Sequence, residues 1–392
     1  MRKPRSSARS HLPREAAQLV WLSTGLSRSG GKLEDAYWEP RLASAVDELL
    51  RDDNEADLTA ALDQLFEADG PAHDELADMV ESRAESTRLN HDGKVWDVLL
   101  VACPVLAWSR FSIPAAPLSA ETLGALKAQL AGHVLAKNAK VALANFLFSP
   151  DQLPRSFCET FQITCELGVR ALTGRDFKLN AKDLPETNRF LSDTRYLLAA
   201  VAVPQGEALF RWNEPDGDKD KALAQWIAQA GPTVEALLPG CAFQPQLPDA
   251  YHAACRQTDQ ASRPYSLRAA IAFLQTTVNL EPAAMKAVIG PFHDQRLEEY
   301  RIGIGPRDSD DIYYGVVWPL LGTEDDNAEV VPEIEAILAE AGFQDVTIHD
   351  HRFPLEFCDD CGSPLYPNKE GELLHAEMPE QPAHGAAGGM LH

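Results

Sequence analysis

The chain has 392 residues, 45% of them hydrophobic, so it can bury more than one core and is long enough for two or three domains. Its 59 acidic and 35 basic residues give a formal net charge of −24, and such a surface repels phosphate backbones, which argues against nucleic-acid binding. No segment offers the roughly 18 uninterrupted apolar residues of a membrane helix, and the N-terminus lacks the apolar core and cleavage site of a signal peptide.

The first part of the chain predicts a basic arm followed by helices. Residues 1–14 hold five basic residues and no acidic one, and we interpret them as a disordered, solvated arm, with contact to an anionic partner as the alternative. Apolar residues in 15–92 then recur at helical spacing between short polar or glycine-containing breaks. The groups are Leu19, Leu22 and Leu26; Leu42, Val46, Leu49 and Leu50; Leu58, Ala61, Leu62 and Leu65; and Leu76, Met79 and Val80. They predict a bundle of about four helices.

Beyond residue 92, apolar β-rich runs alternate with amphipathic helices. Residues 96–107 and 141–148 read as buried strands on either side of a helix capped by Ser119, which is a βαβ unit whose crossover favours parallel pairing. A weak internal repeat of helix, hairpin, helix and strand follows. Its copies are 156–172, 195–212, 223–237 and a strand from 240, then 267–278, 300–318, 330–338 and a strand from 342.

The repeat predicts two ferredoxin-like βαββαβ modules, at 93–247 and 248–352, with 141–148 and 241–247 as their leading strands. The expected fold class is therefore α+β. It consists of a helical N-terminal domain, an α/β body with ferredoxin-like modules, a small zinc-knuckle-like C-terminal tail at 353–379, and a flexible end at 380–392.

The most specific chemical pattern is the run Cys358-Asp359-Asp360-Cys361-Gly362. Two thiolates two residues apart, followed by glycine, form half of a tetrahedral zinc site. A closed structural site needs two more ligands, and we expect His375 and His351 to supply them, with His349 less well placed. Seven cysteines scattered over the chain do not resemble a disulfide framework, so we expect a reduced, cytoplasmic protein.

Two other interpretations of the paired cysteines stay open, a redox pair and two ordinary thiols. A thioredoxin-type pair places its first cysteine at a helix N-terminus. Gly362, Pro364 and Pro367 follow soon after Cys361, which argues against a helix there and favours the metal interpretation.

A second candidate site is Cys158, in the first turn of a predicted helix beside Arg155. The helix dipole and the guanidinium could activate this thiol as a nucleophile. The alternative is a capping box made by Ser156 and Glu159. Further along, Arg263 and Arg268 near a helix start could bind an anion with Arg155, or could pair with carboxylates.

The commonest nucleotide-binding and hydrolase motifs, such as the P-loop and the GxSxG elbow, are missing from the sequence. Several stretches instead resemble the β-proteobacterial DUF2863 family, over nearly everything from Leu12 to Pro379. They are 153–160, 193–197, 263–270, 314–319, 358–362 and 375–379. The resemblance implies a cytoplasmic protein and assigns neither an activity nor a ligand set for the tail.

We therefore expect a cytoplasmic, non-catalytic binding or regulatory protein whose tail is stapled by zinc. Its partner would be a small-molecule effector or another protein, and ferredoxin-like modules, by analogy of fold, also favour a homodimer. One alternative is an enzyme that acts on a small anionic substrate with Cys158 as nucleophile. Another is a scaffold subunit of a larger complex.

Overall fold

The structure is a computed structural model that describes residues 12–379 except 110–111, 176, 188–191, 323 and 325–329. The flexible end predicted at 380–392 and residues 1–11 of the predicted arm lie outside the described residues. The chain divides into two compact units, Met1–Arg256 and Gln257–His392, and the boundary falls inside helix α8 (Tyr251–Val278).

The first unit opens with the helices that the leucine spacing predicts. Leu19, Leu42, Leu58 and Leu76 are fully buried and share one core. That core also contains Cys158, so the helices pack against α6 (Phe157–Thr173). The helices are α1 (Arg14–Ser27), α2 (Lys32–Arg51), α3 (Glu55–Ala68) and α4 (Gly70–Glu85).

Strands of the first unit form a sheet in the order β1-β2-β6-β4, and β7 and β8 also pair with β2. Every pairing in this sheet is antiparallel. The strands are β1 (Ser86–His91), β2 (Lys94–Trp108), β4 (Lys140–Leu143), β6 (Ser192–Pro204), β7 (Ala242–Pro245) and β8 (Asp249–Ala250). The short strands β3 (Ala116–Pro117) and β5 (Phe146–Leu147) pair with each other.

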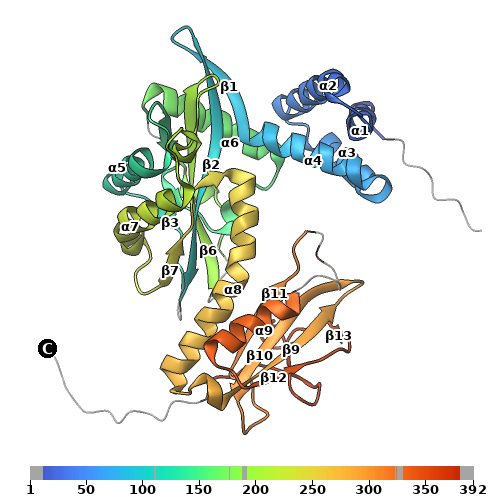
Figure 1. Ribbon diagram of the computed structural model, residues 1–392, viewed down its shortest axis with the longest axis vertical. Coiled ribbons are helices and arrows are strands. Elements are labelled where there is room, and N and C mark those ends of the chain that lie inside the picture. The colour runs from blue at the N-terminus through green and yellow to red at the C-terminus, as the bar shows by residue number, and fades with distance from the viewer. Residues whose placement is uncertain are drawn as a thin grey trace, which may run out of the picture. The chain divides into compact units, whose positions relative to one another are not determined.

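Helices cover both faces of this sheet (Figure 1). On one face α5 (Ala120–Gln129) and α7 (Lys219–Leu237) pack on alternate residues of β6 such as Leu197 and Val201. On the other face α6 and the start of α8 pack on the intervening residues, including Leu198. Because both faces are buried, β6 reads as a continuous apolar run rather than as an alternating pattern.

Three expectations for this region are wrong. The strands at 96–107 and 141–148 were expected to pair in parallel, but β6 lies between β2 and β4 and is antiparallel to both. The second strand of the hairpin expected at 195–212 is replaced by a turn of 3₁₀-helix at Arg211–Asn213. The strand expected to lead the second module instead pairs with β2 as β7, at residues Ala242–Pro245.

The second unit has a sheet in the order β11-β10-β9-β12, in which β10 is antiparallel to β11 and β9, whereas β12 is parallel to β9. Three strands follow α8 before the next helix, and the first of them, β9, was not expected, so this order differs from the predicted βαββαβ. The elements are β9 (Met285–His293), β10 (Leu297–Pro306), β11 (Tyr314–Pro319), α9 (Val330–Ala341), β12 (Asp345–Ile348) and β13 (Phe353–Pro354), which also pairs with β9.

The two faces of the second sheet are covered differently. The later part of α8 and α9 pack on one face, where α9 lies across β9 and β10 (Figure 1). The C-terminal tail lies on the other, and it contains β14 (Tyr366–Pro367) paired with β15 (Leu373–Leu374).

Glycines make room for this tail. Gly290, Gly303 and Gly315 lie on the three neighbouring strands, and a Cβ atom at each would lie 3.1 Å or less from an atom of the tail. At Gly315 this Cβ would lie 2.0 Å from Cζ of Tyr366, so only glycine allows the ring to reach the sheet.

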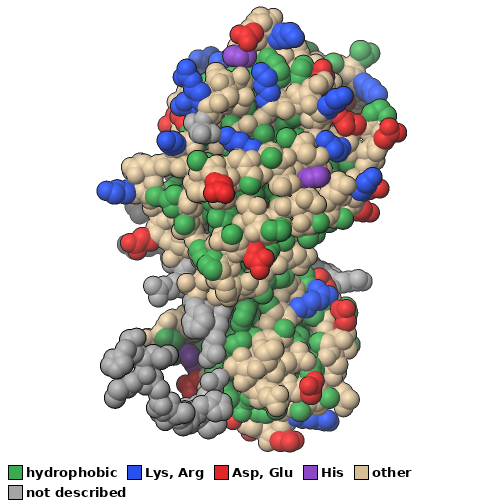
Figure 2. All heavy atoms as spheres, turned by 90° about the vertical axis from the view of Figure 1, so that its left-hand side faces the viewer, with side chains coloured by type: hydrophobic (Ala, Val, Ile, Leu, Met, Phe, Trp, Pro, Cys, Tyr) green, Lys and Arg blue, Asp and Glu red, His purple; other side chains and the backbone are tan. Residues whose placement is uncertain are grey.

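The surface carries both signs of charge. On the face drawn in Figure 2, Lys and Arg side chains lie among Asp and Glu side chains, without a large patch of one sign. Among the residues that the structure describes, no helix combines the length and the apolar character needed to cross a bilayer.

Candidate metal centre

A tight turn in the tail positions the two cysteines. Phe357 and Pro364 form an antiparallel bridge, and we call the residues from 357 to 364 the knuckle. Inside it the Cys358 amide donates to the Ser363 carbonyl and the Gly362 amide donates to the Cys358 carbonyl, both at 2.8 Å. Gly362 has a φ of +70°, a left-handed conformation that favours glycine, which explains the glycine directly after the second cysteine.

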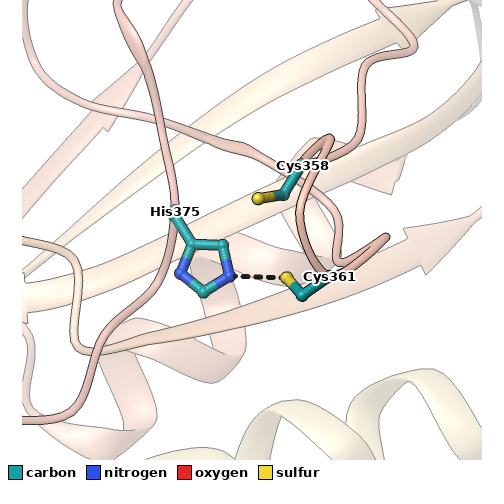
Figure 3. Close-up of side chains that lie close together, drawn as sticks. All are labelled: Cys358, Cys361 and His375. Atoms are coloured by element: carbon teal, nitrogen blue, oxygen red, sulfur yellow. Dashed lines mark hydrogen bonds between the residues drawn. The ribbon is translucent and has the colours of Figure 1, made fainter.

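The β14–β15 pairing returns the chain to the knuckle and delivers His375, which follows β15 directly. The Nε2 atom of His375 lies 3.1 Å from Sγ of Cys361. The ligand atoms of Cys358, Cys361 and His375 all lie within 4.8 Å of one another. Figure 3 shows the imidazole ring facing both sulfur atoms.

The surroundings of Cys361 favour its thiolate. Hydrogen bonds from Ser363, followed by the interaction with the His375 ring, lower the pKa of this exposed thiol to about 6. A thiolate is the form of cysteine that binds metals, so much of the ligand would be in the reactive form at neutral pH.

The donor set fits a zinc ion. Two thiolates and an imidazole are ligands that Zn²⁺ prefers, and in the residues that the structure describes this is the one cluster of three or more His, Cys, Asp or Glu side chains that could hold a metal. Oε1 of Glu377 lies 3.7 Å from Nδ1 of His375, on the side away from the sulfur atoms. Carboxylates commonly orient a metal-bound imidazole from that position.

The structure does not bring His351, expected as the fourth ligand, into this cluster. Its ring packs on the Phe353 ring, with centroids 4.0 Å apart, and its edge lies against Gly371. Nε2 of His349 lies 2.8 Å from the Asn368 carbonyl oxygen. Both histidines thus hold the β14–β15 turn against the start of the tail, and the described part of the cluster has three ligands.

The redox interpretation of the paired cysteines gains no support from their surroundings. The described residues around them form turns and short bridges rather than the helix N-terminus that activates a thioredoxin-type cysteine. Cys358 and Cys361 are both free thiols.

The candidate nucleophile Cys158 lies in the core between α6 and the N-terminal helices and is 1% exposed. Its backbone amide donates to the Glu55 carboxylate at 2.9 Å, so Glu55 from α3 caps the start of α6. Burial, then the Glu55 carboxylate, raises the pKa of the Cys158 thiol to about 12. The thiol therefore lacks the exposure and the acidity of a nucleophile. Of the capping box that the sequence offers as the alternative, one half is present, since Ser156 accepts from the Glu159 amide at 3.1 Å. The Glu159 carboxylate accepts from the Arg155 amide at 2.7 Å and not from that of Ser156.

The arginines considered for anion binding have protein partners. Arg263 is buried and donates to both carboxylate oxygens of Glu324, at 2.6 and 3.1 Å. Arg268 donates to Glu340 at 3.2 Å, and Arg155 donates to the Asp151 carbonyl at 3.3 Å. Pairing with carboxylates, the alternative for two of them, is therefore what the structure shows.

Two residues that bear on the cluster were missed by sequence reasoning. Ser363 lowers the pKa of Cys361, and its position directly after Gly362 could have drawn attention to it. Arg301 of β10 donates to carbonyls at the base of the knuckle, and nothing in its local sequence indicates this.

Comparisons with known proteins agree with the resemblance seen in the sequence. A model of the family described as "Protein of unknown function (DUF2863)" matches residues 4–387, which extends beyond the expected limits of Leu12 and Pro379. Searches of the curated proteins and of the solved structures gave no match. The match spans nearly the whole chain, and the protein therefore belongs to the DUF2863 family.

Proposed function

We propose that this protein binds one Zn²⁺ ion through Cys358, Cys361 and His375. The ion would cross-link two segments of the C-terminal tail, which packs on one face of the second sheet. The observation that carries the proposal is the convergence of the three ligand atoms within 4.8 Å. They come from two separate segments of the tail, the knuckle and the residue after β15, so one ion would cross-link these two segments.

A structural role is favoured over a catalytic one. The tail covers a sheet face lined with glycine, and closing that face requires the tail to hold one conformation. In the described residues no second group of His, Cys, Asp and Glu side chains that could hold a metal lies beside this one. When bound, the ion would cross-link the tail through three ligands of this chain, and a water molecule or one further donor would complete its tetrahedral coordination.

In this proposal the protein is a non-catalytic binding or regulatory protein. The buried, weakly acidic thiol of Cys158 supports that choice over the enzyme alternative. The first sheet supports a ferredoxin-like module led by β2, because β2, β4, β6 and β7 follow the order β7-β2-β6-β4 with α5 and α7 on one face. We propose that it binds a small-molecule effector or a protein partner, and that it forms a homodimer.

The test is the zinc content of the purified full-length protein, measured by elemental analysis. About one zinc per chain is expected in the wild type, and it should be lost in Cys361→Ser and in His375→Ala. His351→Gln and Cys241→Ser are the matched controls and should keep the metal, because neither residue belongs to the cluster. A metal-free wild type, or zinc retained in Cys361→Ser, would contradict the proposal.

A further inference from the structure

Arg301 of β10 is a buried arginine whose side chain is 0% exposed. A charged group in such a place costs free energy unless its surroundings compensate for it. Its Nε donates to the Glu299 carboxylate at 2.6 Å. The guanidinium carbon also lies 4.2 Å from the centre of the Phe292 ring.

The remaining contacts of Arg301 go to the base of the knuckle. Its Nη1 donates to the carbonyl of Glu356 at 2.6 Å and to the carbonyl of Leu365 at 2.8 Å. These carbonyls lie on opposite sides of the knuckle, one before Phe357 and one after Pro364. The guanidinium also lies 4.9 Å from the centre of the Phe357 ring, next to the first cysteine. One nitrogen therefore joins the two chain segments that flank the knuckle and its paired cysteines.

The stability of the sheet alone does not explain why a charged arginine is buried at position 301. In the part of the chain that the structure describes, Nη2 of Arg301 is buried and has no hydrogen-bond partner. Replacing a buried charge by an apolar residue of similar size is often neutral or stabilising. What such a replacement could not reproduce is the link that Nη1 makes between the carbonyls of Glu356 and Leu365. This link reinforces a long backbone hydrogen bond between the same two residues, from the Leu365 amide to the Glu356 carbonyl at 3.4 Å.

We infer that Arg301 is a positioning residue for the metal centre: it holds the knuckle in the conformation in which Cys358 and Cys361 can bind one ion together. The inference rests on the proposed zinc site. Outer partners that orient the ligands of a metal commonly contribute about ten- to a hundredfold to its affinity, and Arg301 acts in the same way through the backbone rather than through the ligand atoms.

The experiment compares Zn²⁺ affinity in the full-length wild type, Arg301→Gln and Arg301→Lys, by competition with a chromogenic chelator at neutral pH. Arg301→Gln should bind Zn²⁺ at least about tenfold more weakly. Arg301→Lys should recover part of the loss, because an ammonium can donate to one or two of the carbonyls but lacks the planar fork of arginine. Co²⁺ spectra give a second readout, since weaker d–d bands in Arg301→Gln would show that the tetrahedral geometry is disturbed.

Arg263 offers a matched control in the same unit. It is also buried, paired with a carboxylate and placed over an aromatic ring, that of Trp318, but its backbone contact is Pro319 in β11. Arg263→Gln should lower thermal stability and leave Zn²⁺ affinity and the Co²⁺ spectrum of the folded protein unchanged. An equal loss of affinity in Arg263→Gln would reduce the effect of Arg301 to general destabilisation and overturn the inference.

A milder variant covers the case in which Arg301→Gln does not fold. Glu299→Gln keeps the arginine and removes the carboxylate that orients its Nε, so a smaller loss of affinity, roughly threefold or more, is expected. If the folded variants bind Zn²⁺ as the wild type does, with the same Co²⁺ spectrum, Arg301 has no positioning role. If the wild type binds neither ion, the zinc site itself is wrong, and the two failures are thereby distinguished.

Discussion

The ring of Tyr366 lies directly against the backbone of Gly315, in the space that the side chain of any other residue would occupy. The tail thus completes the second unit through contact with the main chain of β11. Gly290 and Gly303 on the neighbouring strands admit Phe353 and Pro367 in the same way. The packing of the tail therefore depends on glycine at three positions in the sheet.

The first prediction follows from this contact. Gly315→Ala should lower the free energy of unfolding by about 1–3 kcal/mol, because the new methyl group overlaps the Tyr366 ring and forces it from the sheet. Chemical denaturation followed by fluorescence measures the loss. Gly124→Ala in α5 is the control: a methyl group there meets nothing within 4 Å, and alanine favours a helix, so stability should be kept or raised. Equal stability of Gly315→Ala and the wild type would show that Tyr366 does not lie there.

The second prediction concerns Glu85, at the end of α4, which accepts from the His252 amide at 2.8 Å. Burial raises the pKa of its carboxyl group from 4.5 to about 7. The folded protein therefore holds this proton to a higher pH than the unfolded chain does. The contribution of Glu85 to the free energy of unfolding should fall as the pH rises from about 4.5 to about 7 and stay level above that.

Glu85→Gln should remove this dependence. The variant should match the wild type near pH 4.5 and be more stable at pH 8, by at most roughly 3 kcal/mol, since the neutral amide can still accept from His252. Denaturation curves at the two pH values measure the difference. Glu75→Gln, an exposed residue of the same helix, serves as control and should leave the pH dependence unchanged. A variant that is less stable at pH 8 would contradict the assignment.

The third prediction concerns Arg195 of β6, which is 1% exposed. It donates to Asp193 at 2.5 Å and to the carbonyls of Ile113 and Pro114 at 2.7 Å. Arg195→Gln should cost about 3–5 kcal/mol of stability, because it leaves a mostly buried carboxylate without its partner. Arg88→Gln breaks a more exposed pair with Asp97 and should cost less than about 1 kcal/mol. Similar costs for the two variants would mean that burial of Arg195 is not what matters.

The fourth prediction addresses Cys158 as a nucleophile. With its pKa raised to about 12 by burial, the thiol should react with iodoacetamide at pH 7.5 on the order of a thousandfold more slowly than a free thiol. Mass spectrometry of digested protein measures labelling at each cysteine. Exposed Cys361, in chelator-treated protein, is the internal reference, and Cys158 should be labelled once guanidinium unfolds the chain. Rapid labelling of Cys158 in the native protein would restore the enzyme alternative.

The helices were predictable because their spacing is a local property of the sequence. Leu19, Leu42 and Leu58 repeat at helical intervals, and short breaks separate the groups. By contrast, β1 has little apolar character of its own and becomes a strand by pairing with β2. Strand β9 was not predicted, and its Lys286 is buried because the ammonium donates to the Ser309 carbonyl, a partner distant in sequence.

The metal cluster was predictable in part. The spacing of Cys358 and Cys361 with the following Gly362 identifies a knuckle from local sequence. Which histidine joins the cysteines could not be predicted from local sequence, because it depends on which strand returns to the knuckle. His375 follows β15, which brings it to the knuckle, whereas the ring of His351 packs on Phe353. The spacing of the residues along the chain indicates neither contact.

The glycine-lined face of the second sheet has a consequence for the order of folding during synthesis. The strands that carry Gly290, Gly303 and Gly315 leave the ribosome before Phe353, Tyr366 and Pro367, which fill that face. Until those side chains emerge, helices can cover only one face of the nascent sheet. The other face, which carries the three glycines, stays uncovered. The second unit can therefore reach its final packing only after translation has passed the knuckle.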